Sequence, residues 1–243
     1  TKTVKGAATQ AEPGTEAFTF EVTVENTSAA DTITLTEDSF QDFVDEDGVL
    51  DGDGTGSTGI TIESLSCTTY SIAPGATATC ELTAKVPGAG SLQPGDYFDH
   101  VVVTGTDQTG RSVSDSDDAL VTITDVVPAI TVTKAVTGTS SLQTPGGSFG
   151  YSVTIVNTSL IEDVTVTSLA DFVDTDGALN GTGTQGSAIT MNGLDCSVPF
   201  TIAKGGSKVC TFSATVNGPA GTYYDVVVVS ASDDDENTVT EAD

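Results

Sequence analysis

Residues 18–25 read Phe-Thr-Phe-Glu-Val-Thr-Val-Glu, and this stretch decides the fold class of the chain. Apolar and polar side chains alternate along it, which is typical of a β-strand with one face in a core and the other in solvent. The same alternation recurs in six further segments, whereas no window shows a sustained apolar period of 3.6 residues. These segments are residues 31–38, 77–86, 118–126, 130–136, 150–157 and 162–169. The sequence predicts an all-β protein, with strands short enough to build sandwiches.

An internal repeat organises the chain. Four stretches of the first half recur in the same order in the second half. The pairs are residues 13–28 with 145–159, 42–55 with 171–184, 65–80 with 194–210, and 95–103 with 221–229. We therefore expect two homologous domains of ordinary size, residues 1–127 and 128–243. The joint around Pro128 offers almost no linker, so the pair is expected to form an extended, semi-rigid rod.

The four cysteines fall two to a repeat, Cys67 with Cys80 and Cys196 with Cys210. A Gly-containing turn lies midway between the members of each pair, so a hairpin would bring the two sulfur atoms opposite each other. Zinc is the competing interpretation, but it commonly takes four Cys or His ligands at short spacing, and the chain has one histidine. The sequence predicts two disulfides and hence an oxidising compartment, outside the cell or on its surface.

The charge balance excludes several classes of partner. The chain has 35 acidic and 7 basic residues, a formal net charge of −28. Nucleic acids and anionic membrane surfaces need clustered Lys and Arg, so neither is an expected partner. No apolar run approaches the roughly 18 residues of a membrane span, so membrane insertion is not expected either. Divalent cations are the natural ligands of such a chain.

The order of these motifs resembles a known type of surface module. A lysine in the first strand is followed by Pro-Gly and Val-Asn-Thr-Ser, an Asp-rich loop, a cysteine hairpin and a Tyr/Phe-Asp strand, twice over. This order is similar to the immunoglobulin-like "conserved repeat domain" modules of bacterial and archaeal cell-surface proteins. The resemblance covers nearly the whole chain and implies two tandem Ig-like Greek-key sandwiches. Such modules serve as stalks, adhesins, sheath subunits and filament subunits, so the resemblance fixes architecture more than function.

The sequence offers little for catalysis. The single histidine, His100, is replaced by Val226 in the second repeat, and the cysteines are expected to be oxidised. A lone histidine of this kind is expected to be a partly exposed structural residue. We therefore predict that the protein is not an enzyme but an extracellular structural protein, a subunit of a surface filament or sheath-like assembly. The alternative is a stalk or ligand-binding segment of a large repetitive adhesin, with a ligand on a host or neighbouring cell.

The ends of the two repeats suggest self-association. The second repeat is expected to stop before the counterpart of strand 116–124, and the first lacks residues equivalent to 129–132. A sandwich that lacks a strand exposes backbone and apolar surface, which another chain can cover. Two interpretations are open: copies complete each other head to tail, or the chain is an excerpt of a longer repeat protein.

An acidic loop occurs in both repeats, Asp42–Gly54 and its counterpart from Asp171. Oxygen ligands and glycines at matching positions resemble the start of a calcium loop, and hard oxygen ligands favour Ca²⁺. The competing interpretation is a loop whose carboxylates accept hydrogen bonds from nearby backbone amides. The predicted calcium ligands are Asp42, Asp45, Asp47, Asp51 and Asp53 in the first repeat, and Asp171, Asp174, Asp176 and Asn180 in the second.

Lys2 and Lys134 occupy matching places in the first strand of each repeat. In other surface Ig-like domains a first-strand lysine can form an isopeptide bond with Asn or Asp on the last strand. Asp117, Asp118 or Asp125 could serve in the first repeat. The favoured interpretation is nevertheless a solvated charge at a sheet edge. Glycosylation sequons begin at Asn26, Asn157 and Asn180, with no prediction that sugar is attached.

Overall fold

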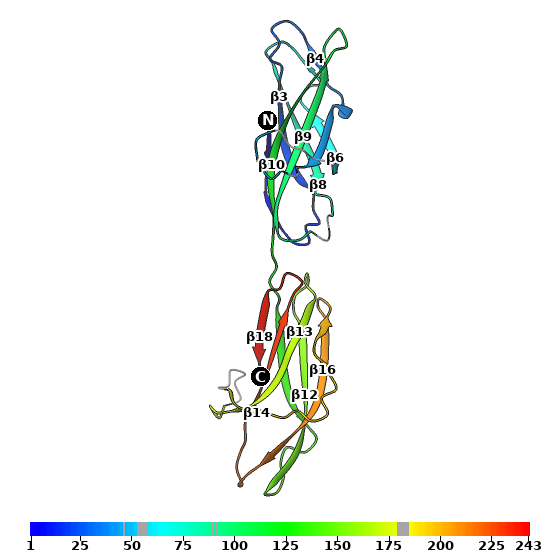
Figure 1. Cartoon of the computed structure of the whole chain (residues 1–243). Coiled ribbons are helices and arrows are strands. Elements are labelled where there is room, and N and C mark those ends of the chain that lie inside the picture. The colour runs from blue at the N-terminus through cyan, green and yellow to red at the C-terminus, as the bar shows by residue number, and fades with distance from the viewer. Residues whose placement is uncertain (46, 53–57, 89, 91, 179–184) are drawn as a thin grey trace. The chain divides into compact units, whose positions relative to one another are not determined.

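The chain folds into two compact all-β units, Thr1–Asp125 and Val126–Asp243, in a computed structural model (Figure 1). The structure describes residues 1–45, 47–52, 58–88, 90, 92–178 and 185–243. The division falls two residues before the boundary expected from the sequence, which placed it after residue 127. The expected rod stays a prediction.

The first unit packs a sheet of order β1-β3-β8-β6 against a sheet of order β5-β9-β10-β2, in which β4 also pairs with β9 and β7 pairs with β4. Pairing of β5 with β6 joins the two sheets. The strands are β1 (Lys2–Val4), β2 (Thr9–Ala11), β3 (Phe18–Glu25), β4 (Ile33–Thr34), β5 (Phe40–Val44), β6 (Gly59–Cys67), β7 (Ser71–Ile72), β8 (Thr77–Lys85), β9 (Gly95–Thr106) and β10 (Ser112–Thr124), with one short 3₁₀ turn, η1 (Glu37–Ser39).

The second unit repeats this plan with a sheet of order β11-β12-β16 and a sheet of order β14-β13-β17-β18, in which β15 also pairs with β13. Its strands are β11 (Ile130–Thr137), β12 (Gly146–Asn157), β13 (Val164–Asp174), β14 (Gln185–Ile189), β15 (Phe200–Ile202), β16 (Ser207–Asn217), β17 (Asp225–Ser232) and β18 (Thr238–Ala242). The all-β prediction is therefore confirmed.

The alternation that predicted the strands also builds the cores. In β3 the side chains of Phe18, Phe20 and Val22 are buried, and the residues between them face outward. In β12 the matching inward positions are Tyr151 and Val153. Because side chains alternate with a period of two, each strand covers its core with every second residue.

Both predicted disulfides are present, Cys67–Cys80 and Cys196–Cys210. In the first unit the two cysteines are direct register partners on β6 and β8. No cysteine is free, so the zinc interpretation is wrong. Closing a loop of 13 or 14 residues constrains the unfolded chain and contributes about 3 kcal/mol on the chain-entropy model.

The second unit has a last strand, contrary to the expectation from the sequence. Strand β18 pairs antiparallel with β17, and Asp243 exchanges two backbone hydrogen bonds with Val227. The sequence did not indicate this strand because an acidic run, residues 233–236, precedes it. That run lies in the turn between β17 and β18. Asp233 accepts hydrogen bonds there from the backbone N–H groups of Asp235 and Asn237. This strand is shorter than its counterpart β10.

Candidate functional site

Lys2 lies in the core of the first unit and not at a solvated edge. The residue is 3% exposed, and its Nζ is 2.6 Å from Asp42 Oδ1 and also contacts Asp99 Oδ1. The ammonium group stands 4.3 Å above the centre of the Phe20 ring. The expectation of a solvated lysine is therefore wrong: the inward register of β1 points its side chain between the sheets.

The second unit holds the same cluster. Lys134 Nζ is 2.5 Å from Asp171 Oδ1 and 2.8 Å from Asp225 Oδ2, and it lies 4.5 Å above the Tyr151 ring. Its side chain is 6% exposed and that of Asp171 is fully buried. We call the two groups the Lys2 cluster (Lys2, Asp42, Asp99) and the Lys134 cluster (Lys134, Asp171, Asp225).

Strand register explains why both clusters have one geometry. Lys2 pairs with Val22 and Lys134 with Val153, the buried positions two residues beyond the aromatic ring in each unit. On the facing sheet, β5 pairs with β9 and β13 pairs with β17 in equivalent registers. One carboxylate therefore comes from β5 or β13 and the other from β9 or β17.

An aspartate of the C-terminal segment of each unit contacts the backbone of the lysine and not its amine. The Lys2 N–H donates to the Asp117 carboxylate, and the Lys134 N–H donates to Asp243 Oδ2 at 2.6 Å. Asp118 contacts His100, and its Oδ2 accepts a hydrogen bond from the Gly52 N–H at 2.6 Å. The residues beside the lysine amine are therefore Asp42 and Asp99, and the expected partners Asp117, Asp118 and Asp125 are wrong.

Burial shifts the ionisation of these groups toward their neutral forms. Desolvation lowers the pKa of Lys2, although the nearby carboxylates oppose that shift. Burial raises the pKa of Asp42 above its usual range, and it raises the pKa of Asp171 to about 6. Oδ2 of Asp42 and Oδ2 of Asp171 are buried without a hydrogen-bond partner among the described residues. An unpaired buried oxygen disfavours the carboxylate, which agrees with the direction of both pKa shifts.

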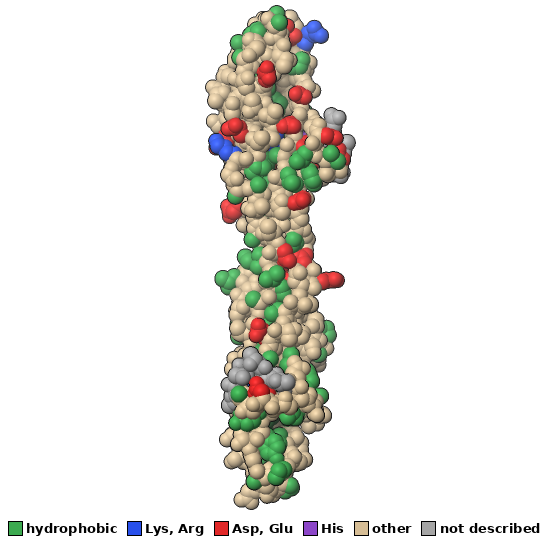
Figure 2. Space-filling model, turned by 90° about the vertical axis from the view of Figure 1, so that its left-hand side faces the viewer, with side chains coloured by type: hydrophobic (Ala, Val, Ile, Leu, Met, Phe, Trp, Pro, Cys, Tyr) green, Lys and Arg blue, Asp and Glu red, His purple; other side chains and the backbone are tan. Residues whose placement is uncertain are grey.

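These clusters are unusual for so acidic a chain. The side chains of two of its seven basic residues are buried in them. On the face drawn in Figure 2, acidic side chains are scattered and basic ones are sparse. The ion pairs Lys5–Glu81 and Lys85–Glu63, by contrast, are exposed and contribute little to stability. Burying a scarce cation beside two carboxylates needs a reason other than solubility.

The acidic loops show the hydrogen bonds of the competing interpretation. Asp45 Oδ1 accepts from the Asp47 N–H at 3.1 Å, and Asp47 Oδ1 accepts from the Val49 N–H at 2.8 Å. Asp174 and Asp176 accept from backbone N–H groups in the same way. Local bonds of this kind stabilise a turn without an ion.

Calcium binding stays a prediction. Among the described loop residues, no three acidic side chains bring one carboxylate oxygen each within 4.8 Å of one another. Asp42 and Asp171 belong to the lysine clusters, because β5 and β13 carry their side chains into the cores. Asp51 lies in the described part of the loop, whereas Asp53 and Asn180 lie outside the described residues.

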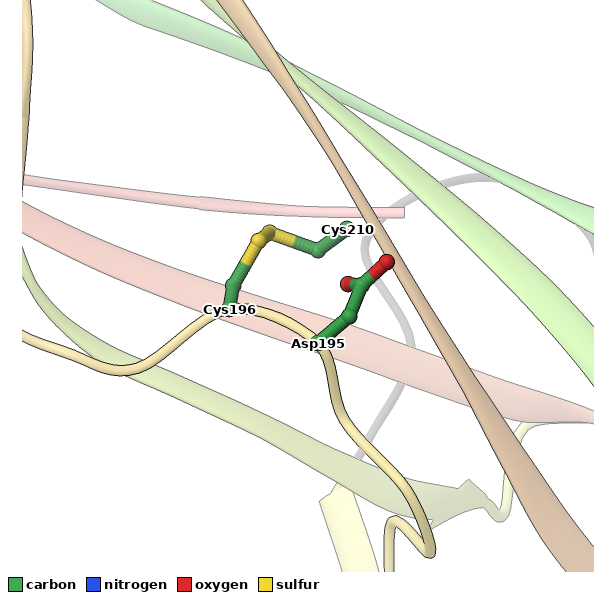
Figure 3. Close-up of side chains that lie close together, drawn as sticks. All are labelled: Asp195, Cys196 and Cys210. Carbon is green, nitrogen blue, oxygen red and sulfur yellow. A yellow bond between two sulfur atoms is a disulfide. The ribbon is translucent and has the colours of Figure 1, made fainter.

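One group of potential metal-binding side chains in the second unit has a structural explanation. Asp195, Cys196 and Cys210 lie together, but the two sulfur atoms are joined as a disulfide (Figure 3). Asp195 instead accepts hydrogen bonds from the backbone N–H and the hydroxyl of Thr211, at 2.7 and 2.8 Å. These bonds lower the pKa of Asp195, and they tie the cysteine segment to β16.

Three other polar residues singled out by the sequence are structural. His100 is 3% exposed, more buried than expected, and contacts Asp118. Asn26 and Asn157 are also buried, and each side-chain amide donates to two backbone carbonyl oxygens. In the folded protein these two amides hold loops in place and are not presented to solvent for glycosylation.

The first unit also has a groove of about 610 Å³ beside the start of β1, lined by both apolar and polar side chains. Its lining includes Val24, Ile33, Val103 and Val113. Val113, on β10, is 53% exposed.

In the second unit, β11 occupies the corresponding place. It begins four residues before Lys134, and Ile130 at its start is 4% exposed and part of the core. Val239, the counterpart of Val113, packs against that core. The groove of the first unit therefore corresponds in position to the start of β11 in the second.

Comparisons with known proteins do not assign a family. No protein-family model matches the chain, and no curated protein matches it. Three similar solved structures are a red sea bream transglutaminase, the periplasmic chaperone SfaE and the E. coli chaperone DraB. Their identities are 11%, 11% and 12%, and their TM-scores are 0.27, 0.25 and 0.26. The matches cover 96%, 98% and 100% of this chain, and 30%, 93% and 96% of those chains. Likenesses this weak carry no argument about this protein.

No described residues form a helix long and apolar enough to cross a membrane. The two disulfides agree with folding in an oxidising compartment.

Proposed function

We propose that the protein is an extracellular structural protein, part of a surface filament or sheath-like assembly, and that it has no catalytic role. In this proposal its units resist unfolding and join further copies of the chain by strand pairing. The observation that supports the proposal is the groove of the first unit, whose apolar residues correspond in position to those that β11 covers in the second unit.

Strand addition explains how such a groove is used. An extended segment laid beside β3 would continue the sheet with backbone hydrogen bonds, and its alternate side chains would enter the groove. A chain that covers Val113 and Ile33 removes apolar surface from water, which is the main source of binding free energy. The proposed occupant is a strand from a second copy, placed head to tail.

The proposal includes calcium as a stabilising ligand of the two acidic loops, because their oxygen-rich composition suits that ion. Chelation that leaves the melting temperature of the chain unchanged would remove calcium from the proposal. The structural role and the groove do not depend on it.

A peptide with the sequence of residues 126–132, Val-Val-Pro-Ala-Ile-Thr-Val, tests the groove. We expect it to bind the chain and to raise the thermal stability of the first unit, because its residues 130–132 occupy the corresponding place in the second unit and a ligand that binds the folded state stabilises it. Isothermal titration calorimetry measures the binding, and hydrogen exchange followed by mass spectrometry reports which amides become protected.

A matched pair of variants completes the design. Val113→Asp places a charge at the groove and should abolish peptide binding. Val209→Asp changes an equally exposed valine of the second unit, 52% exposed, and should leave binding unchanged. Equal binding by both variants, or no binding of the peptide to the unmodified chain, would contradict strand addition.

A further inference from the structure

We propose that each unit forms an intramolecular isopeptide bond, linking Lys2 Nζ to the side-chain carbonyl carbon of Asp99 and Lys134 Nζ to that of Asp225. The geometry points to these two bonds because a buried amine contacts a carboxyl group in each unit, with a second carboxyl group beside it. The inference does not depend on strand addition.

The two carboxyl groups of each cluster have different roles. Asp42 and Asp171 are hydrogen-bonded to Nζ at 2.6 and 2.5 Å, the arrangement needed to exchange a proton with the amine. Asp225 Oδ2 lies 2.8 Å from Nζ but outside hydrogen-bond geometry. We therefore assign Asp225 as the group that is attacked and Asp171 as the group that moves protons. In the first unit Lys2 Nζ donates to both Asp42 and Asp99, and the equivalent strand registers assign Asp99 the role of Asp225 and Asp42 the role of Asp171.

The reaction balances without any added reagent. The lone pair of the neutral Nζ attacks Cγ of Asp99, and a nitrogen–carbon bond forms. Asp42 accepts the proton that leaves the nitrogen and returns a proton to the departing hydroxyl group. A carbon–oxygen bond breaks, one water molecule leaves, and the lysine and aspartate side chains become an amide. Lys134, Asp225 and Asp171 undergo the same steps in the second unit.

The surroundings favour this condensation. Burial lowers the pKa of Lys2, which shifts the amine toward the neutral form that attacks, and it raises the pKa of Asp42, which makes this carboxylate a better acceptor for the proton that leaves the nitrogen. The fold also holds amine and carboxyl in contact, and fixed proximity raises the rate of such intramolecular reactions by large factors. The product amide replaces two buried charges, which are costly to keep out of water.

Each bond would join the two faces of a sandwich. Lys2 is on β1, which pairs with β3, whereas Asp99 is on β9 in the facing sheet. In the second unit β11 pairs with β12, and β17 belongs to the other sheet. The covalent loops run from residue 2 to 99 and from 134 to 225, and each encloses the disulfide of its unit.

Mass spectrometry of the intact, reduced chain tests the proposal. We expect its mass to lie below the mass calculated from the sequence by two water molecules, one for each unit. A proteolytic digest should contain one peptide pair joined through Lys2 and Asp99 and another joined through Lys134 and Asp225. A chain with the full sequence mass, or lysine joined to Asp42 or Asp171, would overturn the assignment.

Variants separate the roles within each cluster. Asp225→Ala should restore one water to the mass, because the attacked group is gone. Asp171→Ala should do the same although Lys134 and Asp225 remain, because the proton carrier is gone. Asp195→Ala changes an exposed aspartate of the same unit and should still show both losses. Two lost waters in Asp171→Ala would overturn the role given to Asp171.

Discussion

Replacing Lys134 by methionine should lower the melting temperature of the second unit by more than about 15 °C, because removing several kcal/mol from a unit of this size shifts melting by at least that much. Without the lysine, Asp171 and Asp225 stay in the core with no cation. Breaking a buried pair in this way typically costs about 3–5 kcal/mol. The substitution also removes the proposed cross-link, and a covalent loop of nearly a hundred residues is worth about 4–5 kcal/mol on the chain-entropy model.

Calorimetry combined with hydrogen exchange measures this effect in the full chain. Amides of β12 and β17 should lose protection in Lys134→Met, while those of the first unit keep theirs. Lys208→Met removes an exposed lysine of the same unit and should change stability by no more than about 0.5 kcal/mol. Melting of Lys134→Met within a few degrees of the unmodified chain would contradict a stabilising lysine cluster.

Removing the disulfide of the second unit should have the next largest effect. Cys196→Ala with Cys210→Ala opens a loop of 14 residues, and we expect a loss of about 3 kcal/mol. Cys210 is fully buried, so alanine is the suitable replacement, because a serine hydroxyl there would need a hydrogen-bond partner.

Guanidinium unfolding of the oxidised chain, the reduced chain and the double variant measures that loss. Reduction and the double substitution should shift the midpoint of the second unit alike. Replacing Cys67 and Cys80 by alanine should instead lower the unfolding midpoint of the first unit only. An unchanged midpoint after complete reduction would show that the bond adds nothing to stability.

The fold and the disulfides could be predicted because their signals are local. The alternation in residues 18–25 reports burial directly, since each side chain faces the core or the solvent according to its place in the strand. The cysteine pairs could be predicted for a similar reason. Cys67 and Cys80 lie on either side of one turn, and they are register partners in the sheet.

The lysine clusters could be predicted only in part, because their members meet across the sandwich. Lys2 contacts Asp42 and Asp99, which are 40 and 97 residues away in sequence. Nothing near Lys2 indicates either partner, and a lysine at a strand end is usually solvated. The available signal was the repeat itself, since Asp99 and Asp225 are the shared acidic residue of two otherwise aromatic and Val-rich strands.

Asp42 shows how a local pattern can mislead. Its closeness to Asp45 and Asp47 in sequence indicated one acidic loop, but β5 runs from Phe40 to Val44. The strand period places Asp42 on the same inward face as Phe40, and both are buried. Counting the strand alternation through to its end would have moved Asp42, and with it Asp171, from the loop to the core.

Single-molecule stretching of the chain between its ends tests whether the protein is a structural element locked against extension. With the Lys134–Asp225 bond in place, tension on the second unit passes through the amide, and only residues 126–133 and 226–243 can extend. At about 3.5 Å per residue this is roughly 9 nm of chain. Without the bond, the whole unit outside its disulfide loop would extend by roughly 36 nm. We expect the short extension for the unmodified chain and the long one for Lys134→Met, and a long extension of the unmodified chain would contradict the proposed lock.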